Sequence, residues 1–154
     1  MNEELKNKIN NFLKTPFNDG GSLKGLPATD EEIQDSEKEL NYKFSKDYIE
    51  FIKEFGGAYL GVNIFAFNNH SMMPKDTVTK VTKDYRRNYE GRTTHKLLSS
   101  SLVIAIDSSG NPIVISSEGK VTIIYHDSDD TEVLANDFNE FVEKIISREI
   151  SDLF

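Results

Sequence analysis

Two adjacent segments near the start of the chain carry apolar residues at helical spacing, and each segment has its own start signal. Thr29 is a good N-cap because its hydroxyl can accept an early backbone N–H, and Glu32 can reach back to it, which predicts a capping box. A second helix is predicted to begin after the N-cap Ser45 and to stop at Gly56 and Gly57. These two helices form the clearest pattern in the sequence.

The rest of the chain alternates between the helical period and extended runs. Further helices are predicted over residues 2–13, 77–89 and 137–150. A loop rich in Gly and Pro, from Pro16 to Pro27, connects the first of them to the pair at 29–57. Extended segments are predicted over residues 59–67, 97–106, 112–116 and 120–126, with a short piece at 131–135.

Turn residues separate the later strands at close intervals. They lie at 107–111 and 118–119, which favours an antiparallel meander. The predicted fold class is therefore α+β, a single domain over residues 1–154. Its largely antiparallel sheet has about four to six strands and is packed by N-terminal, middle and C-terminal helices.

Length and composition narrow the class of protein. A chain of 154 residues most simply forms one domain. No apolar run approaches the roughly 20 residues needed to span a bilayer, and the N-terminus, with Glu3 and Glu4, does not resemble a secretory signal. We therefore expect a cytoplasmic protein that does not bind membranes. The sequence has no cysteine, which excludes disulfides, thiol catalysis and cysteine-based zinc sites.

The charge is acidic overall and unevenly distributed. The net charge of −8 disfavours direct contact with nucleic acid and favours a basic partner. Residues 75–96 nevertheless carry seven basic and three acidic side chains. We interpret the basic ones as a solvated helix face, with a nucleic-acid patch as the alternative. The residues concerned are Lys80, Lys83, Arg86 and Arg87.

A second charged run, over residues 127–140, holds six acidic and no basic side chains. One interpretation is a solvated loop followed by a helix start, with Asp137 as the helix cap. The other is a surface complementary to a basic protein, where negative potential raises the association rate and selects the partner. The same choice applies to the outer face of the helix from Asp30 to Glu39.

No recognised catalytic or metal-binding motif is present. The three histidines, His70, His95 and His126, have no second ligand at a metal spacing on a helix. Asp127 follows His126, but neighbours in a strand point to opposite faces, which argues against an acid–base dyad. The acidic run fails as an EF-hand because Glu132 occupies the position of the required glycine. We therefore predict no cofactor, no metal site and no enzymatic activity.

The aromatic residues fall into two groups. Those in the predicted helices repeat at the spacing of a buried face, which predicts core positions for Tyr48, Phe51, Phe55, Phe138 and Phe141. Those in the extended segment lie on one side of it and either pack in the core or line a concave sheet face used for binding. They are Tyr59, Phe65 and Phe67.

One stretch resembles a known family. An acidic helix with Glu37 and Leu40, then Phe44-Ser45-Lys46-Asp47-Tyr48, then an aromatic helix closed by Phe55-Gly56-Gly57, is similar to the signature of the SUKH superfamily. The family usually has Leu-Pro at the position of Phe44-Ser45 and often Gly at that of Asn41, and both departures keep the local physics. Asp107 before a Gly-Asn turn and Tyr125-His126-Asp127 extend the resemblance over residues 26–146.

The resemblance implies an immunity protein, an antitoxin that binds and occludes a cognate polymorphic toxin without catalysis of its own. The implied toxin is a basic nuclease domain, and the resemblance is greatest to the Bacillus YobK type, which is paired with LXG toxins. We expect the toxin contacts to be Asp127, Asp129, Asp130 and Glu132. The alternatives are an intracellular regulatory or scaffold module of the same superfamily, and an enzyme that uses the acidic run with a metal.

Overall fold

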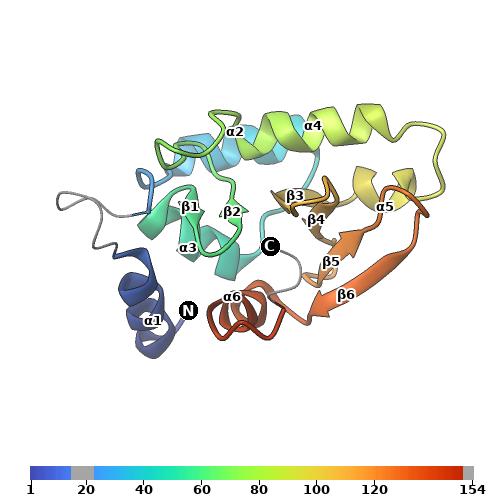
Figure 1. Ribbon diagram of the computed structural model, residues 1–154. Helices are drawn as coiled ribbons and strands as arrows, with labels where there is room; N and C mark the ends of the chain where they lie inside the picture. The colour runs from blue at the N-terminus through green and yellow to red at the C-terminus, as the bar shows by residue number, and fades with distance from the viewer. Residues whose placement is uncertain (15–22, 151–154) are drawn as a thin grey trace.

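A computed structural model describes residues 1–14 and 23–150 of the chain (Figure 1). Most of the predicted connector, from Pro16 to residue 22, lies outside the described residues. The elements in chain order are α1 (Glu3–Leu13), α2 (Asp30–Leu40), α3 (Lys46–Phe55), β1 (Ala58–Tyr59), β2 (Asn63–Ile64), α4 (Val78–Asn88), α5 (His95–Ser99), β3 (Leu102–Ile106), β4 (Pro112–Ile115), β5 (Val121–Ile124), β6 (Thr131–Ala135) and α6 (Phe138–Ile146).

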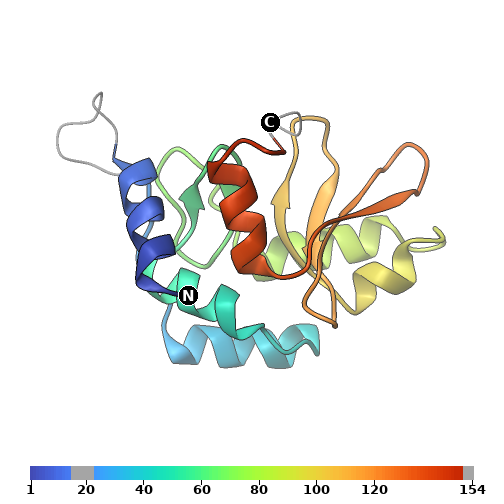
Figure 2. The same cartoon turned by 90° about the horizontal axis from the view of Figure 1, so that it is seen from below.

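The strands form two antiparallel sheets, so the predicted α+β class and the meander are confirmed. β1 and β2 pair as a short hairpin, and the larger sheet has the order β3-β4-β5-β6. This larger sheet lies between α4 on one side and α6 on the other (Figures 1 and 2). α2 runs alongside α4, while α1 and α3 pack against α6. The meander leaves β3 and β6 as the two edge strands.

The helix pair α2–α3 begins and ends largely as the sequence predicts. The Thr29 hydroxyl accepts from the Glu32 N–H at 3.1 Å, and the Glu32 carboxylate accepts from the Thr29 N–H at 3.0 Å, which completes the capping box. Asn41 ends α2 in the left-handed region with φ 49°. Gly56 ends α3 with φ 61°, and a Cβ there would lie 2.2 Å from the Leu26 carbonyl oxygen.

α3 begins where the sequence predicts, directly after Ser45. Ser45 occupies the N-cap position, but its side chain makes no capping hydrogen bond. Asp47 instead turns its carboxylate to another helix, where Oδ2 accepts from the backbone N–H groups of Phe138 at 2.9 Å and Asn139 at 3.2 Å. These N–H groups have no partner within their own helix. A residue of α3 therefore adds to the cap of α6, whose own N-cap Asp137 accepts from the Glu140 N–H at 2.8 Å. Asp47 and Phe138 are 91 residues apart in the chain.

The predicted aromatic core is confirmed. Tyr48, Phe51, Phe55, Phe138 and Phe141 are all buried to 1% exposure or less. The Phe138 ring meets those of Tyr48 and Phe51 edge-on, at centroid distances of 5.4 and 5.3 Å, an arrangement that aromatic rings favour. The Tyr48 hydroxyl donates to the Phe65 carbonyl at 2.6 Å. This cluster joins α3 and α6.

Three predicted boundaries are wrong. The extended segment 59–67 is interrupted, because Gly61 adopts φ 96° and separates β1 from β2. The first part of 97–106 belongs to α5, and only Leu102 onward is a strand. The last helix ends at Ile146 rather than at 150. Beyond it Arg148 has φ 64° and the Glu149 N–H returns to the Lys144 carbonyl at 3.0 Å, a turn that closes the helix.

Candidate functional site

The candidate site is the turn between β5 and β6 together with the first two residues of β6, a segment that we call the acidic loop (residues 127–132). The Tyr125 N–H donates to the Asp130 carbonyl, and the Asp129 N–H donates to the Tyr125 carbonyl, each at 2.8 Å. Asp129 has φ 62°, a left-handed conformation that Asp tolerates better than most residues. The Ser128 hydroxyl accepts from the Asp130 N–H at 3.2 Å. The backbone of the tip is therefore held in one tight turn.

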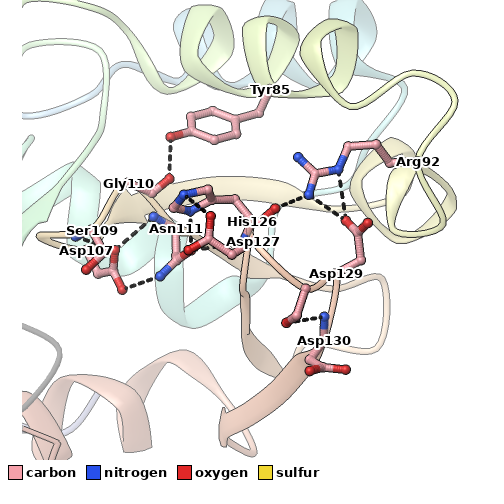
Figure 3. Close-up of polar contacts among 11 residues, drawn as sticks. Tyr85, Arg92, Asp107, Ser109, Gly110, Asn111, His126, Asp127, Asp129 and Asp130 are labelled. Carbon is pink, nitrogen blue, oxygen red and sulfur yellow. Dashed lines mark hydrogen bonds and ion pairs between the residues drawn. The ribbon is translucent and has the colours of Figure 1, made fainter.

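An arginine from outside the hairpin fixes this turn. Arg92 follows α4, and its Nε lies 2.9 Å from Asp129 Oδ1 (Figure 3). The same guanidinium donates to the His126 carbonyl and lies over the Tyr89 ring at 4.3 Å from its centroid. Thr94 adds a hydroxyl at 3.0 Å from Asp129 Oδ1. Charged hydrogen bonds of this kind fix geometry strongly, so Asp129 ties the acidic loop to the α4–α5 connection.

A second polar cluster holds the start of the loop. Asn111 Oδ1 accepts from the His126 N–H at 2.9 Å and lies 2.6 Å from His126 Nδ1. The Asn111 side-chain amide donates to Asp107 at 2.9 Å, which fixes its orientation, so Nδ1 is the donor to Oδ1. The Tyr85 hydroxyl donates to the Gly110 carbonyl at 3.1 Å, which connects α4 to the turn at 107–111 that carries Asn111 (Figure 3).

The expected separation of His126 and Asp127 is wrong. β5 ends at Ile124, so both residues lie in the turn and do not alternate as neighbours in a strand do. His126 Nε2 lies 3.0 Å from Asp127 Oδ1, a contact that becomes an ion pair when the ring is protonated. The Asp127 side chain is 92% exposed. The pair lies at the surface, where water competes for both groups.

The four predicted contact residues share this hairpin tip but differ in accessibility. Asp127, Asp130 and Glu132 are exposed. Asp130 is the least engaged, since its carboxylate has no hydrogen bond or ion pair to any residue that the structure describes. Glu132 accepts the Tyr125 hydroxyl at 2.7 Å from the solvent side. The Asp129 side chain is only 29% exposed and is already bound by Arg92.

The residues that shape the loop, Arg92, Thr94 and Asn111, were not predicted from the sequence as site residues. Arg92 lies 37 residues from Asp129 and Asn111 lies 15 from His126. Neither separation has a periodic signal, since the pairing depends on the placement of α4 and β4 beside the hairpin. One hint lies in the sequence. The turn at 107–111 and the turn after Tyr125 are separated by two predicted strands, so a meander places both turns at the same end of the sheet.

The second acidic surface that the sequence suggested, on α2, is partly neutralised. Asp30 pairs with Lys53 and Glu39 pairs with Lys83, both at 2.7 Å. Glu37 accepts the Phe44 N–H at 2.8 Å. Asp35 is exposed and has no partner in the described part of the chain. Fewer free carboxylates therefore face solvent on α2 than its sequence indicates.

The basic residues of α4 are not a uniform solvated face. Lys80 lies 2.7 Å from Asp84, and Arg87 lies 2.9 Å from the same residue on its other side. Arg86 contradicts the solvated interpretation, because its guanidinium is half-buried and donates to three backbone carbonyls. Burial lowers the pKa of that guanidinium. The carbonyls belong to Leu40, Leu98 and Ser101, at 2.8, 3.1 and 3.0 Å.

The three aromatics of residues 59–67 do not line a common concave face. Phe65 is 3% exposed and Phe67 stacks on Phe44 with an interplanar angle of 3°. Tyr59 is 40% exposed and borders a hollow of about 330 Å³ with Met72. Tyr59 is therefore the most exposed of the three, while Phe67 is half-buried and borders a hollow between α2 and α4.

Over residues 1–14 and 23–150, no three His, Asp or Glu side chains lie close enough to share a metal ion. Within the same ranges, no helix combines the length and apolar character needed to cross a membrane.

The α2–α3 pair, the meander and most of α6 fall within the match to a known family model. The model described as the SMI1 / KNR4 family (SUKH-1) matches residues 27–144. The chain belongs to this family. SUKH-1 proteins include immunity proteins and related regulatory domains, which are generally non-catalytic. The match confirms the resemblance seen over residues 26–146, while the YobK type remains a prediction. Curated proteins give no match.

Proposed function

We propose that this SUKH-1 domain is a bacterial immunity protein that binds a cognate toxin in the cytoplasm and blocks it without chemistry of its own. The proposed toxin is a basic nuclease domain of the LXG type, as the resemblance to the YobK type implies. The acidic loop would meet the nucleic-acid-binding face of the nuclease and exclude its substrate. Family membership supports an immunity or regulatory role, and the overall acidity of the chain supports a basic partner.

The observation that carries the proposal is a set of exposed carboxylates on a fixed turn. Asp127, Asp130 and Glu132 project from the hairpin tip, and the bond from Arg92 to Asp129 holds the turn in place. A surface that is already ordered loses little conformational entropy on binding. Concentrated negative charge also speeds encounter with a basic protein. In this proposal Asp129 positions the loop, and the other three carboxylates face the toxin.

Co-expression tests the function directly. The toxin domain encoded beside this gene would be expressed in cells with and without this protein. We expect growth only in the presence of the protein, together with stoichiometric inhibition of nuclease activity by the purified domain. Cell death at equal expression of both proteins would refute immunity and favour the regulatory scaffold.

Charge reversal tests the proposed face. Asp127→Lys and Asp130→Lys change residues whose carboxylates project into solvent, whereas reversal of Asp129 would also break the loop. We expect the pair of substitutions to slow association about tenfold or more at low salt and to flatten its salt dependence. Asp35→Lys, at an exposed position of α2, is the matched control for each single substitution, because it makes the same change in charge. The reverse result, with Asp35→Lys as the damaging change, would place the contact on α2.

A further inference from the structure

The two edge strands of the four-stranded sheet differ in whether their outward-facing backbone groups are hydrogen-bonded. At the β3 edge, Ile104 accepts the Phe65 N–H at 2.8 Å and the Val103 N–H donates to Thr82 Oγ1 at 3.0 Å. At the other edge, β6 pairs only with β5. Thr131, Glu132 and Val133 are all exposed there, and Val133 keeps 53% of its surface open to solvent. An open strand edge is a template for another strand.

The register identifies which backbone groups are open. The Tyr125 N–H bonds the Asp130 carbonyl, and Ile123 lies opposite Glu132. Since paired residues of antiparallel strands alternate between bonded and non-bonded positions, the backbone groups of Thr131 and Val133 point away from β5. Neither residue bonds another part of the described chain through these groups. At the far end of the strand, Lys144 Nζ occupies the Leu134 carbonyl at 2.9 Å and closes the edge.

We propose that the open edge of β6 docks an extended, basic segment of the toxin as a fifth strand. This inference rests on the proposed function and adds the mode of binding. Backbone hydrogen bonds to Thr131 and Val133 would supply affinity, as in other cases of strand addition. The exposed Val133 side chain would pack against an apolar residue of the incoming strand. The open stretch is about 10 Å long at the usual rise per residue, which suits a short strand.

Charge distinguishes a basic strand of the toxin from a second copy of this chain as the occupant of the β6 edge. No basic residue occurs between residues 127 and 140, and Asp130 and Glu132 flank the open backbone groups. Lysine or arginine side chains of a toxin strand would pair with these carboxylates. A second copy of this chain would instead bring its own Asp130 and Glu132 against them, and like charges opposite each other destabilise paired strands. The acidic edge therefore disfavours self-association and selects a basic partner.

Amide hydrogen exchange tests the pairing without any substitution. The probe is the catalytically inactive toxin domain encoded by the adjacent gene, bound to the full chain. We expect the amides of Thr131 and Val133 to exchange freely in the unbound protein and to slow about tenfold or more in the complex. A complex in which both amides exchange at their free rates would overturn strand addition and leave the proposed function standing. No complex at all would overturn both.

Val133→Pro provides the second test. Proline removes the outward N–H, and an edge position whose N–H faces solvent tolerates it without loss of pairing to β5. We expect toxin binding to weaken about tenfold, since an interface hydrogen bond is lost. Val133→Thr is the matched control, because it keeps the N–H and the branched shape, and it should bind nearly as well as the parent. Equal toxin binding by Val133→Pro and Val133→Thr would overturn the inference. It would also be overturned if the free protein were a dimer and Val133→Pro converted that dimer to monomers. If the proline variant does not fold, the exchange measurement decides.

Discussion

The bond between Arg92 and Asp129 predicts a large effect for one substitution outside the acidic loop. Arg92→Ala removes two guanidinium contacts to Asp129, at 2.9 and 2.8 Å, and a donor to the His126 carbonyl. It also removes the cation above the Tyr89 ring. Asp129 would then keep its left-handed backbone with only Thr94 to hold its carboxylate. Both stability and loop order should fall.

The magnitude follows from burial. A hydrogen bond to a charged group contributes about 1.5–3 kcal/mol when protected, and an exposed ion pair about 0.2–1 kcal/mol. The Arg92 and Asp129 side chains are 31% and 29% exposed, which places the pair between these cases. With about 0.5 kcal/mol for the ring contact, the expected loss is about 2 kcal/mol. For a chain of 154 residues this lowers Tm by about 4–8 °C.

Thermal unfolding followed by circular dichroism measures the loss. Arg87→Ala is the matched control, because Arg87 is 70% exposed and its guanidinium lies against Asp84 on the surface of α4; its Tm should barely change. A double-mutant cycle with Asp129→Asn isolates the pair, since Asn also tolerates the left-handed conformation. The reasoning fails if Arg92→Ala is no worse than Arg87→Ala, or if the cycle is additive.

Three further substitutions test the scaffold. Asp47→Ala leaves the first N–H groups of α6 without their acceptor and should cost about 2 kcal/mol in denaturant unfolding. Gly56→Ala combines a positive φ with a Cβ against the Leu26 carbonyl and should cost at least about 3 kcal/mol. The Asn136 N–H at 2.6 Å lowers the pKa of the Glu140 carboxyl. The contact therefore adds to the free energy of unfolding at pH values above the ordinary pKa of 4.5. This contribution is lost as the pH falls through the lowered pKa of Glu140 in the folded protein. Glu140→Gln should therefore melt lower than the parent at pH 7, and the gap should close in acid.

Each of these three substitutions has a control variant or a control measurement. Asp35→Ala removes an exposed carboxylate from α2 and should leave denaturant unfolding unchanged. Gly110→Ala also has a positive φ, at 86°, but has open space around its Cβ, so it separates backbone strain from the clash at Gly56. If Glu140→Gln and the parent keep a constant difference in Tm from pH 7 to pH 3, the Asn136 contact is not the cause.

The sequence by itself determined the features whose signals lie within a few residues. Thr29 and Glu32 are three positions apart, so the capping box could be predicted before the fold was known. The turn at Asp107 and the glycine at 119 mark the ends of successive strands, which was enough to predict the meander. The period of the aromatics in α3 and α6 predicted the core. In each case one short stretch of chain supplies both the donor and the acceptor, or the whole buried stripe.

Only the tertiary structure decided which charged groups are free. Asp129 looked like a contact residue, but Arg92 reaches it from the end of α4. Asp47 lies in the first turn of α3, but its carboxylate also accepts from the first N–H groups of α6. Arg86 looked like a surface cation, but it donates to three carbonyls. The physical reason is the same for all three residues. Their partners lie far away along the chain and leave no periodic pattern in the sequence. The contacts form only when the packing of apolar faces brings distant helix and strand ends together.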